Sequence, residues 1–140
     1  MEYKRFGDAI LVRIDRGEEI MEQLKRVCEA ESILLASVEA IGAVREFTVG
    51  VLDPAEKVFR PNQFQGVYEI TSLSGNVSTM DGAYYAHLHM SAGDESGHVV
   101  GGHLNRAVVS ATCEMILRVI DGQIDRRFDP DVGLNVFRFD

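Results

Sequence analysis

The sequence predicts an α+β fold, a mostly antiparallel β-sheet with one main helix packed on it, as a single domain over residues 1–140. Short apolar runs rich in β-branched residues recur along the chain, and the segments between them have the turn chemistry of hairpins. One segment, residues 18–31, has helical periodicity instead. A length of 140 residues and a hydrophobic fraction of 46% suit one globular core of ordinary composition.

The first strand is expected at residues 9–14, a short apolar run that ends at the polar break 15–17. A helix is expected over residues 18–31, because its apolar residues recur at helical spacing. Two glutamates in its first turn would also stabilise it through their interaction with the positive end of the helix dipole. The apolar residues of this helix are Ile20, Met21, Leu24, Val27 and Cys28.

Strands and turns alternate through the middle of the chain. Residues 32–44 are mostly small and apolar, which predicts a strand buried on both faces, and Gly42 within them indicates a bulge or a close backbone approach. The turn chemistry of residues 53–57 predicts a hairpin, and residues 60–63 are expected to form a polar link. The other strands of this region are expected over residues 46–52, 58–59, 66–75 and 76–80.

A second hairpin is expected at Asp81-Gly82, which leads into a strand over residues 83–91. Because side chains alternate between the two faces of a strand, Leu88 and Met90 are expected in the core. The residues that share the opposite face are Tyr85, His87, His89 and Ser91. Further strands are expected over residues 98–100, 107–120 and 134–139, and flexible breaks or turns over residues 92–97, 101–102, 121–123 and 129–133.

The composition argues against several classes of protein. No segment is long and apolar enough to span a bilayer, and residues 1–8 are charged where a signal peptide needs an apolar run, so we expect a cytoplasmic protein. The net charge of −8 and the scattered basic residues lack the phosphate-binding pattern of a nucleic-acid-binding protein. Cys28 and Cys113 show no Cys-x-x-Cys spacing, so we interpret both as buried apolar residues.

All four histidines of the chain lie within residues 87–103. His87 and His89 are two residues apart on a predicted strand, which places their Cα atoms about 6.6 Å apart on one face, so both imidazoles can reach one ion. His103 follows a double glycine that lets the backbone approach closely and turn back toward that strand, and it completes the three-histidine set of a zinc site with one open position. His98, which lies beside a predicted turn, is the alternative candidate for the third ligand.

The same segment offers few alternatives to a metal. Its four glycines are not followed by Gly-Lys-Ser/Thr, and Asp94 and Glu95 would repel an anion, which excludes a phosphate loop. No combination of serine or cysteine with histidine stands out as a nucleophile and its base. Glu69 and Tyr85 are the conceivable proton-transfer partners of a metal-bound site, and Glu69 is otherwise expected to face solvent.

Several separated motifs, in this order, resemble the plants-and-prokaryotes conserved (PPC) domain family, in its prokaryotic single-domain branch. They are Ile41-Gly42-Ala43-Val44-Arg45-Glu46, Asp53-Pro54, the segment 66–75, His87-Leu88-His89-Met90-Ser91, Gly101-Gly102-His103-Leu104 and the ending 129–134. The resemblance implies an α+β fold, a homotrimer, and a metal bound by His87, His89 and His103, whereas His98 has no counterpart. Plant members join this domain to a DNA-binding AT-hook with an Arg-Gly-Arg-Pro motif, which this chain lacks.

Two functions follow from these observations. The first is a stand-alone, trimeric, metal-binding PPC domain with a binding or regulatory role, linked to DNA or to transcription; the acidic charge supports DNA only weakly. The second is a metal-dependent enzyme, with zinc held by three histidines, that acts on a small molecule.

Overall fold

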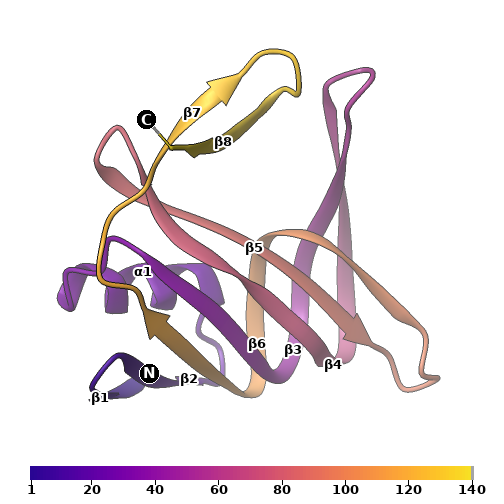
Figure 1. Cartoon of the computed structure of the whole chain (residues 1–140). Helices are drawn as coiled ribbons and strands as arrows, with labels where there is room; N and C mark the ends of the chain where they lie inside the picture. The colour runs from indigo at the N-terminus through magenta and orange to yellow at the C-terminus, as the bar shows by residue number, and fades with distance from the viewer. Residues whose placement is uncertain (140) are drawn as a thin grey trace.

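The computed structural model describes residues 1–139, which form one helix and eight strands (Figure 1). Among residues 1–139 only α1 is helical, over Ile20–Ala30. The strands are β1 Glu2–Phe6, β2 Ala9–Asp15, β3 Ala36–Asp53, β4 Val58–Met80, β5 Ala83–Gly93, β6 Val99–Val119, β7 Asp125–Asp129 and β8 Leu134–Arg138. The predicted class, a mostly antiparallel sheet with one helix, is confirmed.

Six strands form the main sheet in the order β1-β2-β6-β3-β4-β5, and every pair in it is antiparallel. The first part of β6 also pairs with β5, so that β3, β4, β5 and β6 close into a ring of strands. The closure depends on the length of β6, which pairs with β5 over its first five residues and with β3 and β2 further along. Strands β7 and β8 form a separate hairpin that lies above this ring (Figure 1).

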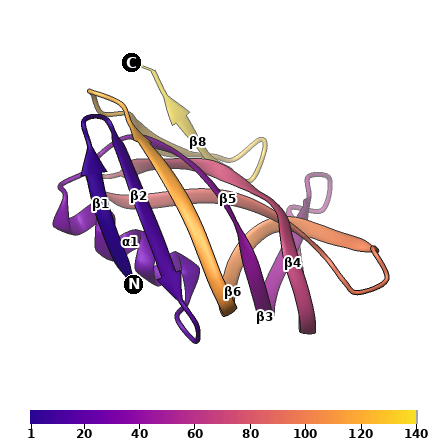
Figure 2. The same cartoon turned by 90° about the horizontal axis from the view of Figure 1, so that it is seen from below.

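The core lies between α1 and one face of the sheet, and Figure 2 shows the helix along that face. Leu24 and Val27 of the helix are fully buried there with Ile10 and Ile14 of β2 and Leu117 of β6. The helix begins at a Glu19 cap, whose carboxylate accepts a hydrogen bond from the Glu22 backbone N–H at 2.8 Å. The helix predicted over residues 18–31 is therefore confirmed to within two residues.

Two predictions for the region around Gly42 have different outcomes. The expected bulge is present, because the β3 register shifts between Ala40 and Gly42, where a Cβ would lie 2.4 Å from the Thr112 carbonyl oxygen. The expectation of a strand over residues 32–44 buried on both faces was wrong. The strand begins at Ala36, and its burial alternates because only one of its faces contributes to the core.

The structure also contains strand pairing where none was expected. The polar link 60–63 and the double glycine 101–102 are parts of the long strands β4 and β6, because their backbones pair with β3 and β5. Strands β1 and β7 were missed, since both are short and charged, as edge strands often are. No helix among residues 1–139 is long and apolar enough to cross a membrane.

Candidate metal centre

Strand alternation places His87 and His89 on one face of β5, with fully buried Leu88 between them on the core face. The closure of β5 on β6 then sets His103 directly opposite His89 in the antiparallel register. Directly opposed residues on one face of a strand pair have Cβ atoms about 4.5–5.5 Å apart, so the third imidazole joins the first two without any loop. The three histidines predicted as ligands are thus neighbours on two adjacent strands.

The three imidazoles form a compact triangle. Their ring centroids are separated by 5.2 Å between His87 and His89, 5.1 Å between His87 and His103, and 5.6 Å between His89 and His103. One nitrogen of each ring lies within 4.8 Å of the others. An ion at the centre of a triangle with 4.8 Å sides is about 2.8 Å from each corner. Ring rotations that move each nitrogen by about 0.7 Å therefore bring it to the 2.0–2.1 Å of a zinc bond.

Gly102 allows β6 to approach β3 closely enough to place His103. A Cβ at this position would lie 2.5 Å from the Gly50 carbonyl oxygen and 3.1 Å from the Gly50 backbone nitrogen. Gly50 is itself the register partner of His103. The close backbone approach expected at the double glycine is confirmed, whereas the flexible break expected there was wrong, because residues 101–102 are paired within β6.

The surroundings keep the His87 and His103 imidazoles neutral, which is the form that ligates a metal. Burial, together with smaller effects of the nearby His103, Arg126 and His89, lowers the pKa of His87 to about 4. Burial also lowers the pKa of His103, followed by the effect of His89. At neutral pH both rings carry a free nitrogen lone pair, and the chemistry of this donor set fits a zinc-type divalent ion.

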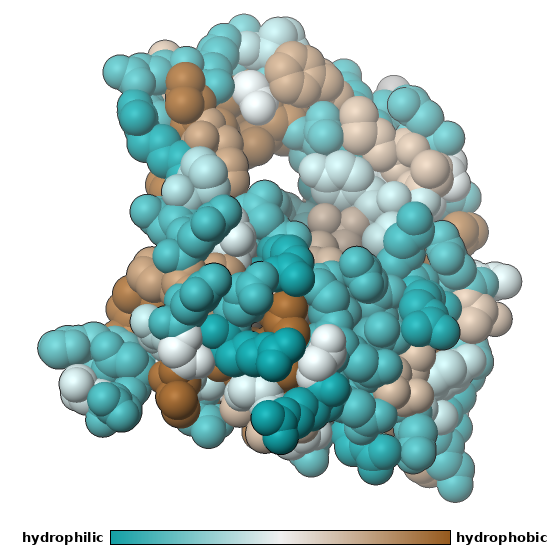
Figure 3. Space-filling view, turned by 180° about the vertical axis from the view of Figure 1, so that it is seen from behind, coloured by the Kyte–Doolittle hydropathy of each residue, from teal (hydrophilic) through white to brown (hydrophobic). Residues whose placement is uncertain are grey.

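The imidazoles face a cavity of about 760 Å³ between two hairpins. One wall is the tip of the β3–β4 hairpin, and the other is the β7–β8 hairpin (Figure 1). Figure 3 shows the molecule hollowed below the upper hairpins. The lining residues are Gly50, Val51, Leu52, Lys57, Phe59, Tyr85, His87, His89, Gly102, His103, Phe128, Gly133, Leu134 and Asn135.

Lys57 joins the two hairpins at the mouth of the cavity. Its ammonium donates a hydrogen bond to the Pro130 carbonyl oxygen, and its stem passes over Gly133, where a Cβ would lie 3.3 Å from Cγ of the lysine. On the inner side, the Phe59 ring meets the His103 imidazole edge to face at 5.8 Å between centroids. Phe59 thus covers one side of the His103 imidazole.

Arg126 is a residue of this region that the sequence did not indicate. Its side chain is 4% exposed and lies between the Tyr85 and Phe137 rings, with its guanidinium carbon 4.7 Å and 4.3 Å from their centroids. Its nitrogens donate hydrogen bonds of 2.8, 2.8 and 2.7 Å to Ser78 Oγ, the Asn135 carbonyl oxygen and Asn76 Oδ1. In the sequence it is one of two adjacent arginines, and nothing in the local pattern distinguishes a buried arginine from an exposed one.

The other residues singled out in the sequence have separate places. His98 is exposed beside Asp94, with its Nδ1 3.7 Å from a carboxylate oxygen, and it is not part of the imidazole triangle. Glu69 is exposed and pairs with Gly93, four residues along β5 from His89, so the suggested role beside the histidines has no support. Tyr85 lines the cavity, and its hydroxyl accepts a long hydrogen bond from Asn135 Nδ2 at 3.4 Å.

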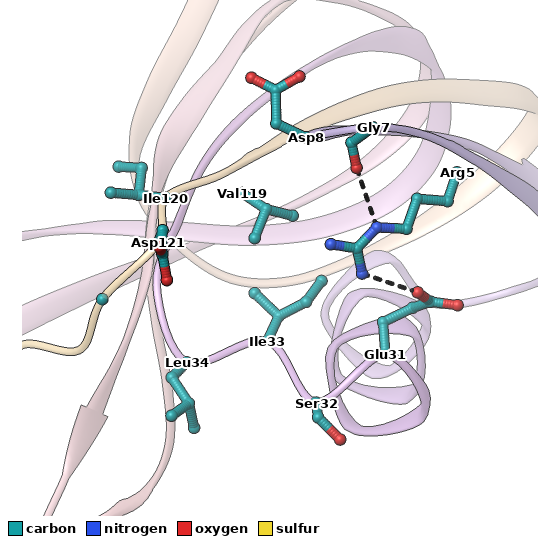
Figure 4. Close-up of a pocket in the computed structure, with 11 residues that line it drawn as sticks. Arg5, Gly7, Asp8, Glu31, Ser32, Ile33, Leu34, Val119, Ile120 and Asp121 are labelled. Atoms are coloured by element: carbon teal, nitrogen blue, oxygen red, sulfur yellow. Dashed lines mark hydrogen bonds and ion pairs between the residues drawn. The ribbon is translucent and has the colours of Figure 1, made fainter.

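A second pocket, of about 440 Å³, lies at the other end of the sheet between the β1–β2 turn and the end of α1 (Figure 4). Arg5 spans it and donates hydrogen bonds of 3.0 Å to both the Gly7 carbonyl oxygen and the Glu31 carboxylate. Arg5 and Glu31 are thus already paired with each other, and no histidine or cysteine lines this pocket among the described residues. The histidine cavity is the better candidate for chemistry.

Together, the fold and the histidine cavity define a small α+β domain with a candidate metal site. The chain belongs to the Plants and Prokaryotes Conserved (PCC) domain family, whose profile matches residues 1–121. This match confirms the family resemblance, although it ends before the motif at 129–134.

Three solved structures are similar to this chain over 99% of its length. A candidate DNA-binding protein from Bacteroides thetaiotaomicron is 33% identical, with a TM-score of 0.95 and 96% of its own chain covered. The metal-containing protein AF0104 from Archaeoglobus fulgidus is 34% identical, with a TM-score of 0.88 and 97% covered. A plant- and prokaryote-conserved protein from Pyrococcus horikoshii is 30% identical, with a TM-score of 0.85 and 94% covered.

Among curated proteins, the chain is 26% identical over 125 residues to the bifunctional protein GlmU of a Synechococcus strain. That alignment includes 87% of this chain and 19% of the relative, so the chain spans about a fifth of the length of the curated protein it matches.

Proposed function

We propose that this protein is a metal-dependent enzyme that binds a divalent ion, zinc, through His87, His89 and His103. Its substrate is a small molecule bound in the adjoining cavity. The observation that carries this proposal is the convergence of three half-buried or exposed imidazoles, within 4.8 Å of one another, on a cavity of about 760 Å³. A site with three protein ligands that adjoins open space is typical of catalytic rather than structural zinc.

The chemistry of the donors supports the metal. The lowered pKa of His87 and of His103 favours the neutral rings that a metal requires. A solved relative, 34% identical over 99% of this chain, is described as metal-containing. When bound, a zinc ion with an open position supplies Lewis-acid polarisation to a ligand there.

The residues of the chain have distinct roles around that position. Phe59 packs edge to face on His103 and keeps water from one side of the imidazoles. Arg126 lies under the Tyr85 ring and fixes it, and Asn135 donates to the Tyr85 hydroxyl, so that this hydroxyl is the proton-transfer group in the cavity. Glu69 takes no part, because it is exposed and belongs to another part of the sheet.

Elemental analysis tests the metal, on protein purified without chelator and on the His103→Ala variant. We expect about one divalent ion per chain in the wild type and a large loss in the variant; a wild type without metal, even after incubation with zinc, contradicts the proposal. Turnover of a small-molecule library before and after chelation then tests the use of the metal.

A binding or regulatory role linked to DNA is the second candidate, because similar solved structures are named as candidate DNA-binding proteins. The net charge of −8 opposes it, since phosphate contacts need an excess of Lys and Arg. Retardation of duplex DNA at low salt, with a steep loss of affinity as salt rises, would support this role. Absence of retardation at low salt would exclude it.

Assembly into a homotrimer is part of the proposal. The sheet face opposite α1 exposes apolar side chains next to charges of both signs, which suits contact with another copy of the chain. Leu11 and Ile41 are exposed on it by 46% and 62%. Light scattering coupled to size exclusion tests the assembly: a mass three times the 15.5 kDa of the chain is expected, and a monomer at micromolar concentration contradicts it.

A further inference from the structure

The charge at the cavity is opposite to that of the whole chain. The chain has 22 acidic and 14 basic side chains, yet no acidic side chain of the described residues lines the cavity. Lys57 is the lining residue with a permanent positive charge. A bound divalent ion would increase the positive potential further, so the chemistry of the cavity favours an anion.

Lys57 is free of a carboxylate partner within residues 1–139. Its ammonium donates a hydrogen bond to the neutral carbonyl oxygen of Pro130. The two acidic residues of the same turn are directed to Arg60 instead, which is 3.8 Å from Asp53 and hydrogen-bonded to Glu56. The turn thus separates its charges and presents the unpaired cation to the cavity.

Arg126 provides a second cation behind the Tyr85 wall of the cavity. All three of its described hydrogen bonds go to neutral oxygens, and no carboxylate of residues 1–139 forms an ion pair with it. A buried charge without a counter-ion keeps most of its field, because little water screens it. Its guanidinium carbon lies 4.7 Å from the centroid of the Tyr85 ring, and Tyr85 lines the cavity.

The remaining walls are apolar. Phe59 and Leu52 line one side of the cavity, and Phe128 and Leu134 line the other. The volume of about 760 Å³ is within the 300–1,000 Å³ of small-molecule sites. A ligand that fills it therefore needs an apolar body as well as a charge.

We propose that the ligand of this cavity is a small organic carboxylate with an apolar body. Its carboxylate lies towards the histidines and Lys57, and its apolar part lies against Phe59 and Phe128. This inference rests on the proposed function, since it places the ligand at the same site. It adds a substrate class, which neither the metal nor the fold determines.

Calorimetric titration with 3-phenylpropionate and with its neutral amide, 3-phenylpropanamide, tests the inference. The two probes have the same apolar body and differ in charge. We expect the zinc-loaded wild type to bind the carboxylate at least about tenfold more tightly, which is the size of one charge-assisted contact. The metal-free wild type should bind both probes more weakly and still prefer the carboxylate, because Lys57 and Arg126 remain.

Lys57→Gln is the informative variant, because it removes the charge at an exposed position and keeps a hydrogen-bond donor for Pro130. It should lower the preference for the carboxylate about fivefold or more. Lys25→Gln is the matched control: Lys25 is an exposed helix lysine, 3.7 Å from Glu29, and does not line the cavity. Its preference should equal that of the wild type.

Equal binding of the two probes by the wild type overturns the inference, and so does an unchanged preference in Lys57→Gln. Metal content, measured on each sample, separates this outcome from failure of the proposed function. If the protein binds zinc but binds the two probes equally, the metal site stands and the proposed carboxylate ligand is refuted. If the protein binds no zinc, the proposed function is refuted. The relative affinity of the metal-free protein for the two probes then decides whether the cavity prefers a carboxylate.

Discussion

Gly102→Ala should damage the metal site without removing a ligand. The added Cβ would lie 2.5 Å from the Gly50 carbonyl oxygen, and ordinary contact begins at 3.4 Å, so β6 and β3 must separate by about 0.9 Å. Because His103 is the next residue and the register partner of Gly50, it moves with the strand. Metal sites tolerate errors of about 0.2 Å in ligand distance, so we expect zinc affinity to fall about 10- to 100-fold.

The same substitution should lower the free energy of unfolding by about 1–3 kcal/mol, the usual range for overpacking. Zinc affinity is measured by competition with a chromogenic chelator, and stability by urea unfolding of the metal-free protein. Gly93→Ala is the matched control on β5, since its added Cβ would meet no atom closer than 3.5 Å. Wild-type zinc affinity in Gly102→Ala would refute the claim that close strand packing positions His103.

Three further predictions concern other groups of the chain. His98→Ala should keep the full metal content, because His98 is exposed and outside the triangle; loss of metal in this variant would show that the ligand set is wrong. Cys28 and Cys113, whose pKa burial raises to about 12, should resist iodoacetamide at pH 8 in the folded protein and react after unfolding, as counted by mass spectrometry. The metal-free protein should lose stability in urea from pH 7 to pH 5. In this range the unfolded chain gains a proton near pH 6.5 that folded His87, with a pKa of about 4, does not accept; a flat profile would contradict the burial of a neutral His87.

The helix and the strand faces could be predicted from the sequence because each depends on a local period. The apolar spacing at residues 18–31 gave the position of α1 to within two residues, and alternation along β5 separated His87 and His89 from the core residue Leu88. The pairing of His103 with His89 was expected only in part. The double glycine indicated a return of the chain, whereas the direct opposition arises from the closure of β5 on β6.

Other features depend on contacts between distant segments and leave no local pattern. Residues 60–63 pair with β3 despite a proline and three polar residues, because the pairing of β3 extends to the tip of the hairpin. Arg126 is buried because the Tyr85 and Phe137 rings enclose it. Neither ring is adjacent to Arg126 in the sequence, so no local pattern indicates this burial. The cavity itself could not be predicted, since its two walls come from hairpins more than 70 residues apart.

Diffraction data collected at the zinc absorption edge, from crystals grown with zinc and without chelator, test the central claim most directly. We predict one anomalous peak at the histidine triangle, about 2.0–2.1 Å from one nitrogen each of His87, His89 and His103, with its open side towards the cavity. An anomalous map without a peak there, or with zinc only at exposed His98, would contradict the account.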